Sequence, residues 1–395
     1  MIKFDFDKFC YGCTACASIC PVSAITLEQN NEGFIVPKVN EDKCIQCNAC
    51  ERICIFLNPL KSKKDLKSSK FNIMSLTNIK ELLKSTSGGA FYAIAKHFIE
   101  NEGYVCGCAW NKEMKAEHII VNTLSDLEKL QGSKYVQSDI KACMEKVKIL
   151  ISEGKKVLFS GTPCQVEAIK RVVNNSELLF TCSLYCEGVP SPKVLDKHIK
   201  CLEERYNSKI IDIKMREKKP YGWNAPRAEY QFLNQKKLCK LSYLNDEYIE
   251  SFIQGLFMRK SCFNCHYKGS NIEADFILGD YWGANYSDIK SNNNQGLSSV
   301  IVRTQKADEL INKVQNIHLM ESSYEKAVRN NNNLITSIKE NEHRDEFFKN
   351  IDDMDFLINV NRFINYNSIK MKATDFFDKT RLYKLLRFIR NRRIR

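Results

Sequence analysis

Eight of the 18 cysteines in this 395-residue chain occur in two short blocks near its start. The first block reads CYGCTACASIC, from Cys10 to Cys20, and the second reads CIQCNACERIC, from Cys44 to Cys54. Both blocks have the spacing Cys-x2-Cys-x2-Cys-x3-Cys. Three thiolates on one tightly wound loop can bind three corners of a 4Fe-4S cube, so this spacing is typical of iron-sulfur binding. Zinc also uses Cys-x2-Cys pairs, but it rarely uses this longer spacing twice.

The two blocks form an internal duplication, and the duplication indicates how the cysteines are shared between clusters. In ferredoxins with two clusters, the fourth cysteine of each block binds the cube of the other block. The expected iron ligands are therefore two sets of four, namely Cys10, Cys13, Cys16 and Cys54 for one cube and Cys44, Cys47, Cys50 and Cys20 for the other. Ile55 stands where the pattern has a proline, which shapes the loop but binds no metal. Residues 1–57 are thus predicted to be a ferredoxin-type domain with two 4Fe-4S clusters.

The remaining cysteines are spread along the chain: Cys106, Cys108, Cys143, Cys164, Cys182, Cys186, Cys201, Cys239, Cys262 and Cys265. Cys262 and Cys265 form a further Cys-x2-Cys pair, which needs two more ligands to bind a metal. Cys164 and Cys186 follow predicted strands, and ligand sites of α/β sheets gather at strand ends. A buried core thiol is the alternative for each single cysteine, and it is the interpretation we keep for the others.

Strands alternating with helices are predicted after residue 70, beyond a polar, lysine- and serine-rich linker at 58–70. The expected strands are Phe71–Leu76, Tyr104–Ala109, His118–Val121, Lys156–Ser160, Leu178–Leu184, Ile210–Met215, Arg227–Phe232 and Lys237–Tyr243. The expected helices are Gly89–Glu100, Ser138–Ser152, Gln165–Val173, Pro192–Tyr206 and Glu247–Met258. This alternation indicates an α+β or α/β fold with a mixed sheet, over about residues 71–310. Residues 311–395 are expected to be a helical C-terminal region.

Several passages resemble the family of coenzyme F-420 hydrogenase/dehydrogenase beta subunits, in the subgroup that carries an N-terminal two-cluster ferredoxin domain. They are STSGGA (Ser85–Ala90), SKYVQS (Ser133–Ser138), FSGTPCQV (Phe159–Val166), CEGVPSP (Cys186–Pro192), RKSCFNCHYK (Arg259–Lys268) and LGDYWG (Leu278–Gly283). The resemblance implies a flavoprotein-type domain that binds FAD and a third 4Fe-4S cluster. It also implies the ligands of that cluster, which are Cys164, Cys186, Cys262 and Cys265.

The same passages supply candidate cofactor-binding residues. A glycine-rich start of a helix offers free backbone N–H groups to a phosphate, so Ser87, Gly88 and Gly89 are candidates, although a plain N-cap role for Ser87 is the alternative. Lys134 is a candidate charge for a pyrophosphate and Tyr135 a candidate stacking face. Ser138, Gly161 and Thr162 complete the expected set.

Electron transfer is the function that these features predict. Clusters carry single electrons, whereas FAD exchanges electrons singly or in pairs. We therefore expect an iron-sulfur flavoprotein oxidoreductase that connects reduced ferredoxin, or another redox protein, with coenzyme F-420 or another organic substrate. The catalytic residues are not identifiable from the sequence. Two alternatives stay open: a relay subunit that serves a partner enzyme and has no substrate of its own, and a reductase of surface-polysaccharide biosynthesis.

The distribution of charged and apolar residues indicates which partners and which compartment to expect. Eight of the 13 net positive charges lie after residue 378 without an acidic residue between them, so a general nucleic-acid surface is not expected. This basic, amphipathic end is predicted to be a helix that either packs on its own domain or contacts an anionic membrane surface. Met1–Phe9 carries no apolar signal segment, which favours a cytoplasmic protein, and disulfides are not expected in that reducing compartment.

Overall fold

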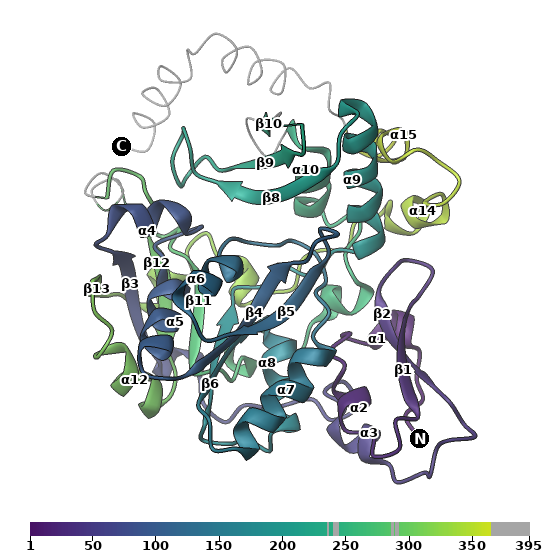
Figure 1. Cartoon of the computed structure of the whole chain (residues 1–395), viewed down its shortest axis with the longest axis horizontal. Coiled ribbons are helices and arrows are strands. Elements are labelled where there is room, and N and C mark those ends of the chain that lie inside the picture. Colours follow the sequence, from purple (N-terminus) through teal and green to yellow (C-terminus); the bar gives the residue numbers. More distant parts are fainter. Residues whose placement is uncertain (235–236, 240–244, 286–287, 289–291, 365–395) are drawn as a thin grey trace.

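The computed structural model describes residues 1–234, 237–239, 245–285, 288 and 292–364 (Figure 1). Three β-sheets organise this part of the chain, with two, three and eight strands. The basic helix expected in the C-terminal tail, within 370–395, lies outside the described residues. Within the described part, no helix combines the length and the apolar character needed to cross a lipid bilayer.

The eight-stranded sheet is the centre of the molecule, with the strand order β13-β3-β12-β11-β7-β6-β4-β5 (Figure 1). Its strands are β3 (Lys70–Leu76), β4 (Tyr104–Trp110), β5 (Ala116–Val121), β6 (Val157–Gly161), β7 (Leu179–Leu184), β11 (Phe276–Asp280), β12 (Ser298–Val302) and β13 (Ile317–Glu321). Strands β4, β6, β7 and β11 run parallel to one another. The outer strands pair antiparallel, so the sheet is mixed, as the alternation of strands and helices predicts.

Helices cover both faces of this sheet, which explains why its central strands are apolar without alternation. All five residues of β6 are buried, and successive side chains enter opposite cores. Phe159 packs in the core beneath α7 (Lys141–Ser152) and α8 (Pro163–Val172), whereas Leu158 packs beneath α5 (Ala90–Glu100). The C-terminal ends of the parallel strands remain open between these layers.

The three-stranded sheet forms a second layer above that open edge (Figure 1). Its antiparallel strands are β8 (Ile210–Glu217), β9 (Arg227–Phe232) and β10 (Lys237–Cys239). Its core is shared with four helices, namely α9 (Pro192–Tyr206), α10 (Glu247–Ile253), α14 (Arg344–Lys349) and α15 (Phe356–Asn361). Further helices of the body are α4 (Ile79–Lys84), α6 (Leu124–Leu127), α12 (Gln305–Ile311) and α13 (Tyr324–Val328).

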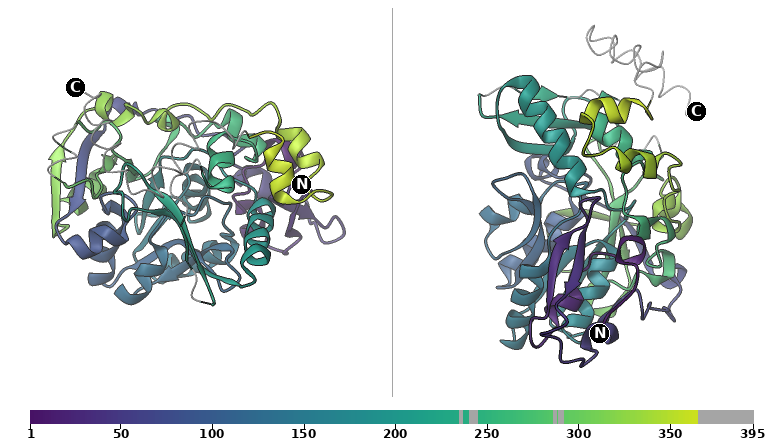
Figure 2. Two further views of the ribbon diagram at one scale, coloured as in Figure 1. Left: turned by 90° about the horizontal axis from the view of Figure 1, so that it is seen from above. Right: turned by 90° about the vertical axis from the view of Figure 1, so that its right-hand side faces the viewer.

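The N-terminal region consists of a β-hairpin and three short helices. The hairpin pairs β1 (Ile25–Gln29) with β2 (Ile35–Val39), and the helices are α1 (Phe6–Phe9), α2 (Ala15–Ser18) and α3 (Ala49–Ile53). Helix α2 contacts both α7 and α8, and α3 contacts α8. The right-hand view of Figure 2 shows this region lying against the helical face of the large sheet. The expected ferredoxin-type unit is therefore packed on the α/β body.

Buried ion pairs and hydrogen bonds attach the N-terminal region to the body. The guanidinium of Arg344, 1% exposed, forms an ion pair with Glu32 at the tip of the β1–β2 hairpin. The Arg171 side chain on α8 donates to the carbonyl oxygens of Cys54 and Asn58, the latter at 2.7 Å. Tyr267 donates its hydroxyl proton to the carbonyl oxygen of Ile55 at 2.8 Å. These contacts connect the body to the hairpin and to the segment at the end of the second cysteine block.

Two segments differ from the expectations. The linker at 58–70 is anchored in part, because Leu66 is buried and its backbone N–H donates to the Ser270 hydroxyl. The region expected to be helical from residue 311 first contributes β13, which pairs with β3 at the edge of the large sheet. β11, β12 and β13 are each only five residues long, and apolar runs of that length do not distinguish a strand from part of a buried helix.

Replacing Glu32 with Gln is expected to lower the free energy of unfolding by about 2 kcal/mol, because Arg344 would keep a buried charge with only Asp345 as its ionic partner. Urea unfolding of the full chain, followed by circular dichroism, measures this loss. Glu28→Gln is the matched control on the same hairpin. Its pair with Lys38 is exposed, so a change below about 1 kcal/mol is expected. Equal losses in both variants would contradict the prediction.

Candidate iron-sulfur and cofactor sites

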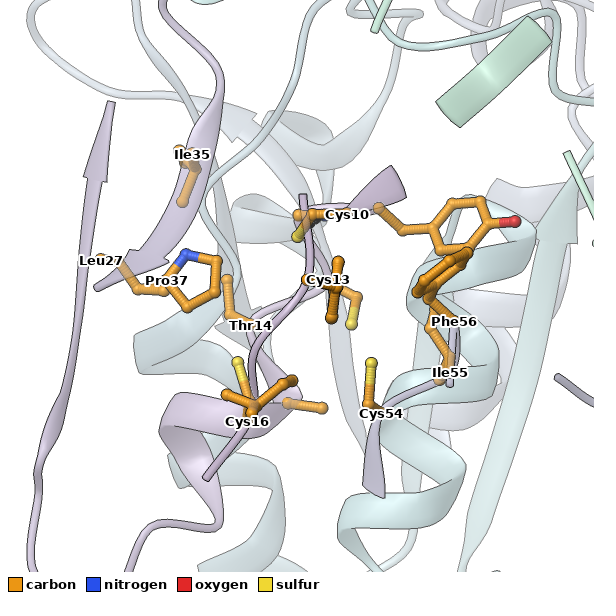
Figure 3. Close-up of a pocket in the computed structure, with 15 residues that line it drawn as sticks. Cys10, Cys13, Thr14, Cys16, Leu27, Ile35, Pro37, Cys54, Ile55 and Phe56 are labelled. Carbon is orange, nitrogen blue, oxygen red and sulfur yellow. Dashed lines mark hydrogen bonds between the residues drawn. The ribbon is translucent and has the colours of Figure 1, made fainter. Parts of the chain in front are cut away.

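Four cysteines of the N-terminal region surround one small cavity, and they are the four expected to bind the first cube. The loop that precedes α2 contributes Cys10 and Cys13, α2 contributes Cys16, and the end of α3 contributes Cys54. Figure 3 shows their sulfur atoms gathered around the same space, with apolar side chains such as Phe56 beside them. Cys54 therefore lies with the cysteines of the other block, as the shared-ligand rule predicts.

A second cavity is lined by Cys20, Cys44, Cys47 and Cys50, which are the expected ligands of the second cube. Cys47 is exposed and Ile45 beside it is 60% exposed, so this group lies at the molecular surface. The first group is more deeply placed, because Cys16 and Cys54 are buried and Cys10 and Cys13 are half-buried.

The duplicated sequence produces a duplicated backbone. Gly12 and Gln46 both have positive φ, and so do Thr14 and Asn48, the residues that precede α2 and α3. Each pair is separated by the 34-residue period of the cysteine blocks. In each block, two residues with left-handed backbone stand two positions apart. They turn the chain sharply enough to direct three cysteine side chains inward. Only one of these four positions is a glycine. A Cβ there would lie 2.2 Å from the Gln137 Nε2 atom, so the site is crowded as well as left-handed.

Burial controls the protonation of these thiols. It raises the pKa of Cys16, and the neighbouring Cys10 and Cys54 thiols raise it further. Burial likewise raises the pKa of Cys13 well above its ordinary value, with Cys16 and Cys10 contributing. Iron binds the thiolate form, so cluster assembly must release these protons.

A third group of cysteines comes from three separate segments of the body. Cys164 is in the first turn of α8, and Cys186 follows β7. Cys262 lies within the 3-10 turn at 260–264, and Cys265 directly follows that turn. Burial raises the pKa of Cys164 to about 12, and the thiols of Cys265 and Cys186 add to the rise. Cys186, Cys265 and Cys164 in turn raise the pKa of Cys262, after burial. The four residues of the RKSCFNCHYK, CEGVPSP and FSGTPCQV passages are therefore electrostatic neighbours.

The first and third groups are adjacent. Tyr11 lines the first cavity, and after burial its pKa is raised by the nearby Cys265, Cys164 and Cys262 thiols. Its hydroxyl oxygen accepts a hydrogen bond of 3.2 Å from the backbone N–H of His266. One residue of the N-terminal loop thus extends from one cysteine group to the other.

Within the described residues, no three histidine, cysteine, aspartate or glutamate side chains converge closely enough to hold a single metal ion. The cysteines of the first two groups instead line cavities. That arrangement suits a cluster in which each thiolate binds a different iron atom. The donor sets, consisting of thiols alone, also fit iron-sulfur clusters.

A cavity of about 530 Å³ opens at the C-terminal ends of the parallel strands, between the large sheet and the three-stranded sheet. Cys186 of the third cysteine group is part of its lining. Ligands of open α/β sheets bind at this edge. A cavity of this volume is in the ordinary range for a cofactor or small-molecule site.

Seven of the eight expected cofactor-binding residues line this cavity: Ser87, Gly89, Lys134, Tyr135, Ser138, Gly161 and Thr162. Gly88 does not line it and instead packs against the large sheet, where a Cβ would lie 2.1 Å from the Met74 carbonyl oxygen. Gly89, with φ of 86°, is the N-cap of α5, so the N-terminus of that helix faces the cavity. Tyr135 stacks on Phe252 with ring centroids 4.7 Å apart.

Lys134, the candidate charge for a pyrophosphate, lines the cavity and is hydrogen-bonded to its own loop. Its ammonium donates to the carbonyl oxygens of Lys129, Gln131 and Gly132, so these hydrogen bonds hold its own loop in place. Burial lowers its pKa. Three backbone carbonyl groups thus accept hydrogen bonds from its ammonium beside the cavity.

Several cavity residues were not identified from the sequence. Arg216 of β8 forms an ion pair with Asp280 of β11 and lies over the ring of Trp282, 5.5 Å from its centroid. His118 also lines the cavity, and burial lowers its pKa to about 4, so its imidazole is neutral at pH 7. In the sequence, the LGDYWG passage contains Asp280 and Trp282 of this wall. No sequence motif indicates Arg216, which comes from the three-stranded sheet.

One expectation about the remaining cysteines is wrong. The structure joins Cys106 of β4 and Cys143 of α7 in a disulfide, whereas both were expected to be free core thiols. Both residues are fully buried, as expected for core cysteines. They meet because α7 packs across the face of the sheet that carries Cys106, a tertiary contact with no signature in the local sequence.

The shared-ligand arrangement predicts a specific pattern of iron loss. Cys54→Ser and Cys13→Ala should each remove about four iron atoms per chain, because each removes one ligand of the first cube. The Cys54→Ser/Cys13→Ala double variant should lose no more than either single one, whereas Cys54→Ser/Cys47→Ala should lose about eight. Iron and acid-labile sulfide analysis of anaerobically prepared protein measures this. Cys201→Ser, on α9, is the control. A further loss in the first double variant would contradict the assignment.

Comparisons with known proteins agree with the two-part organisation. Residues 154–326 match the family model for the C terminus of the coenzyme F420 hydrogenase/dehydrogenase beta subunit, and residues 9–57 match a 4Fe-4S dicluster domain. The F subunit of F(420)H(2) dehydrogenase from Methanosarcina mazei is 24% identical over 202 residues, which are 48% of this chain and 57% of that relative. The chain thus spans little more than half of that relative.

Two further matches extend over more of the chain. An uncharacterized protein of Methanocaldococcus jannaschii is 24% identical over 333 residues, which are 75% of this chain and 84% of that protein. A chain of the F420-reducing [NiFe] hydrogenase complex from Methanosarcina barkeri aligns with a TM-score of 0.48 and 16% identity, over 69% of this chain and 90% of that one. The chain therefore combines an N-terminal 4Fe-4S dicluster domain, over residues 9–57, with a region that matches the C terminus of coenzyme F420 hydrogenase/dehydrogenase beta subunits, over residues 154–326.

Proposed function

We propose that the chain is an iron-sulfur flavoprotein oxidoreductase that passes electrons between 4Fe-4S clusters and a two-electron acceptor or donor through FAD. The observation that supports this most is the spatial order of four sites. A surface cysteine group is followed by a buried group, then by a third group, then by a cavity of cofactor size. Tyr11 connects the second and third of these sites, and Cys186 belongs to both the third and the fourth.

The third cysteine group is proposed to hold a further 4Fe-4S cluster. Its donors are four thiols from α8, the segment after β7 and the 3-10 turn at 260–264. Backbone contacts fix these segments: the N–H of Cys265 donates to the Ser337 hydroxyl at 2.9 Å, and the Lys268 ammonium donates to the Cys186 carbonyl oxygen. A preformed frame of this kind lowers the entropy lost when metal binds.

FAD is proposed to occupy the large cavity. The N-terminus of α5 faces the cavity, and a helix N-terminus favours a phosphate group. An aromatic residue, Tyr135, and three hydroxyl-bearing residues, Ser87, Ser138 and Thr162, line the same space. FAD would supply the conversion between single electrons and electron pairs. The chain's own residues would place it beside the third cysteine group and exclude water.

The surface cysteine group is proposed as the point where a redox partner, such as reduced ferredoxin or another redox protein of the same complex, exchanges electrons. Exposure of Cys47 and Ile45 gives a partner close access to this group. Coenzyme F-420 is one candidate for the two-electron substrate at the opposite end of this row of sites, where the large cavity lies. Arg216 and Trp282 both line the cavity at that end.

Anaerobically prepared protein is expected to contain about twelve iron and twelve sulfide per chain if all three cubes form. Cys262→Ser should lower both values to about eight, because the third cube would lose one ligand. Cys201→Ser is the matched control and should retain the full content. A wild-type value near eight, unaffected by Cys262→Ser, would contradict a third cluster.

Flavin content tests the cavity. One FAD per chain is expected after anaerobic purification, and Cys108→Phe should reduce it several-fold, because the larger ring would enter the cavity that Cys108 lines. Absorption spectra and extraction of the flavin measure the ratio. Cys201→Phe is the control for a bulky substitution elsewhere, and the iron content should not change in either variant.

The second candidate is a relay subunit without its own substrate, which the relationship to the F subunit of F(420)H(2) dehydrogenase favours. Clusters without bound FAD would support this alternative.

With FAD bound, the reduced protein is expected to bleach the visible absorption of coenzyme F-420 if that coenzyme is the acceptor. Unchanged absorption would exclude this acceptor.

A further inference from the structure

Arg259 is a buried cation at the boundary between the N-terminal region and the body. The residue is 2% exposed. Its guanidinium donates to the carbonyl oxygen of Ile35 at 2.6 Å and to that of Cys10 at 3.2 Å. Its Cζ atom lies 5.0 Å from the centre of the Phe34 ring. The side chain therefore contacts a proposed ligand residue of the first cluster and the hairpin beside it.

The backbone of the same residue organises the third cysteine group. The N–H of Arg259 donates to the carbonyl oxygen of Val189, in the segment that follows Cys186, at 2.9 Å. Its carbonyl oxygen accepts from the N–H of Cys262 at 3.0 Å. Arg259 thus connects the loop of the first group with two segments of the third. Sequence distance gives no indication of this, because Cys10 and Arg259 are 249 residues apart.

The charge of Arg259 has no carboxylate to balance it among the described residues, and its Nε–H has no hydrogen-bond partner there. Arg344, which is equally buried at the same boundary, is paired with Glu32. Burying a cation without a counter-charge is strongly unfavourable, so a counter-charge is expected nearby. The nearest candidates are the cysteine groups on its two sides. The guanidinium donates to the backbone carbonyl oxygen of Cys10, and the Arg259 backbone is hydrogen-bonded to Val189 and to Cys262.

We propose that Arg259 is a positioning residue whose guanidinium is the shared counter-charge of the first and third clusters, where it makes both clusters easier to reduce. The inference rests on the proposed function for the third cluster, but its effect on the first cluster does not depend on it. A thiolate-bound cube is an anion, and reduction adds one more negative charge. A nearby cation stabilises the reduced form more than the oxidised form, so it raises the reduction potential.

Two variants test this charge in opposite ways. Arg259→Gln removes the cation and keeps a donor for Ile35. Gln137→Glu leaves Arg259 in place and adds a carboxylate beside it, because a Cβ on Gly12 would lie 2.2 Å from Gln137 Nε2 and 3.0 Å from Arg259 Nη2. The Glu side chain keeps an oxygen to accept the 2.9 Å hydrogen bond from the Ile35 N–H. Gln137→Glu therefore tests the charge even if Arg259→Gln fails to fold.

The measurement is an anaerobic redox titration of the full chain, followed by electron paramagnetic resonance. The signal of the first cluster is identified as the one lost in Cys54→Ser, and that of the third as the one lost in Cys262→Ser. Both Arg259→Gln and Gln137→Glu are expected to shift the first-cluster midpoint to more negative potential. At the wild-type midpoint, less than half of that cluster should then be reduced. Arg259→Lys keeps the charge and should shift the midpoint less than Arg259→Gln.

Arg344→Gln is the matched control, because it also removes a buried guanidinium from this boundary. Its charge is balanced by Glu32, so this variant should lose stability and retain the wild-type midpoints. A shift as large as that of Arg259→Gln would overturn the proposal. Unchanged midpoints with full iron content in both Arg259→Gln and Gln137→Glu would also overturn it. A wild-type iron content near eight would instead refute the third cluster, and a first-cluster shift would still support the role of Arg259.

Discussion

The attachment of the N-terminal region to the α/β body is the constraint on which the rest of the structure depends. Backbone carbonyl groups in the two cysteine blocks and the hairpin are bound by side chains of the body, among them Arg171, Arg259 and Tyr267. Each of these carbonyls would be costly to bury without a donor. The donors therefore specify one orientation of the region. That orientation brings the first cysteine group next to the third.

The cavity depends on a second constraint, which is the meeting of two sheets. The parallel strands of the large sheet end at one edge, and the three-stranded sheet covers that edge with β8. Neither sheet encloses the space alone. The ion pair between Arg216 of β8 and Asp280 of β11 connects the two at the cavity wall, and Trp282 stacks on Trp223 with ring centroids 4.5 Å apart.

Local patterns in the sequence predict those parts of the fold and site that depend on local spacing. The cysteine spacing predicts both N-terminal ligand groups, because the fourth ligand follows from a repeated block. The central strands and the long helices, such as α9, follow from periodicity. β11 to β13 and the Cys106–Cys143 bond do not, since they depend on packing between distant segments. Arg216 and Arg259 also depend on such packing, and no spacing rule indicates the partner of a single arginine.

The position of the half-buried Tyr11 between two cysteine groups has a kinetic consequence. An electron that moved between those groups would stay within one polypeptide, across a boundary held by buried hydrogen bonds. The rate of that step would not depend on how dilute the protein is. Only encounters at the exposed group near Cys47 would depend on protein concentration and on the salt that screens the charges of a partner.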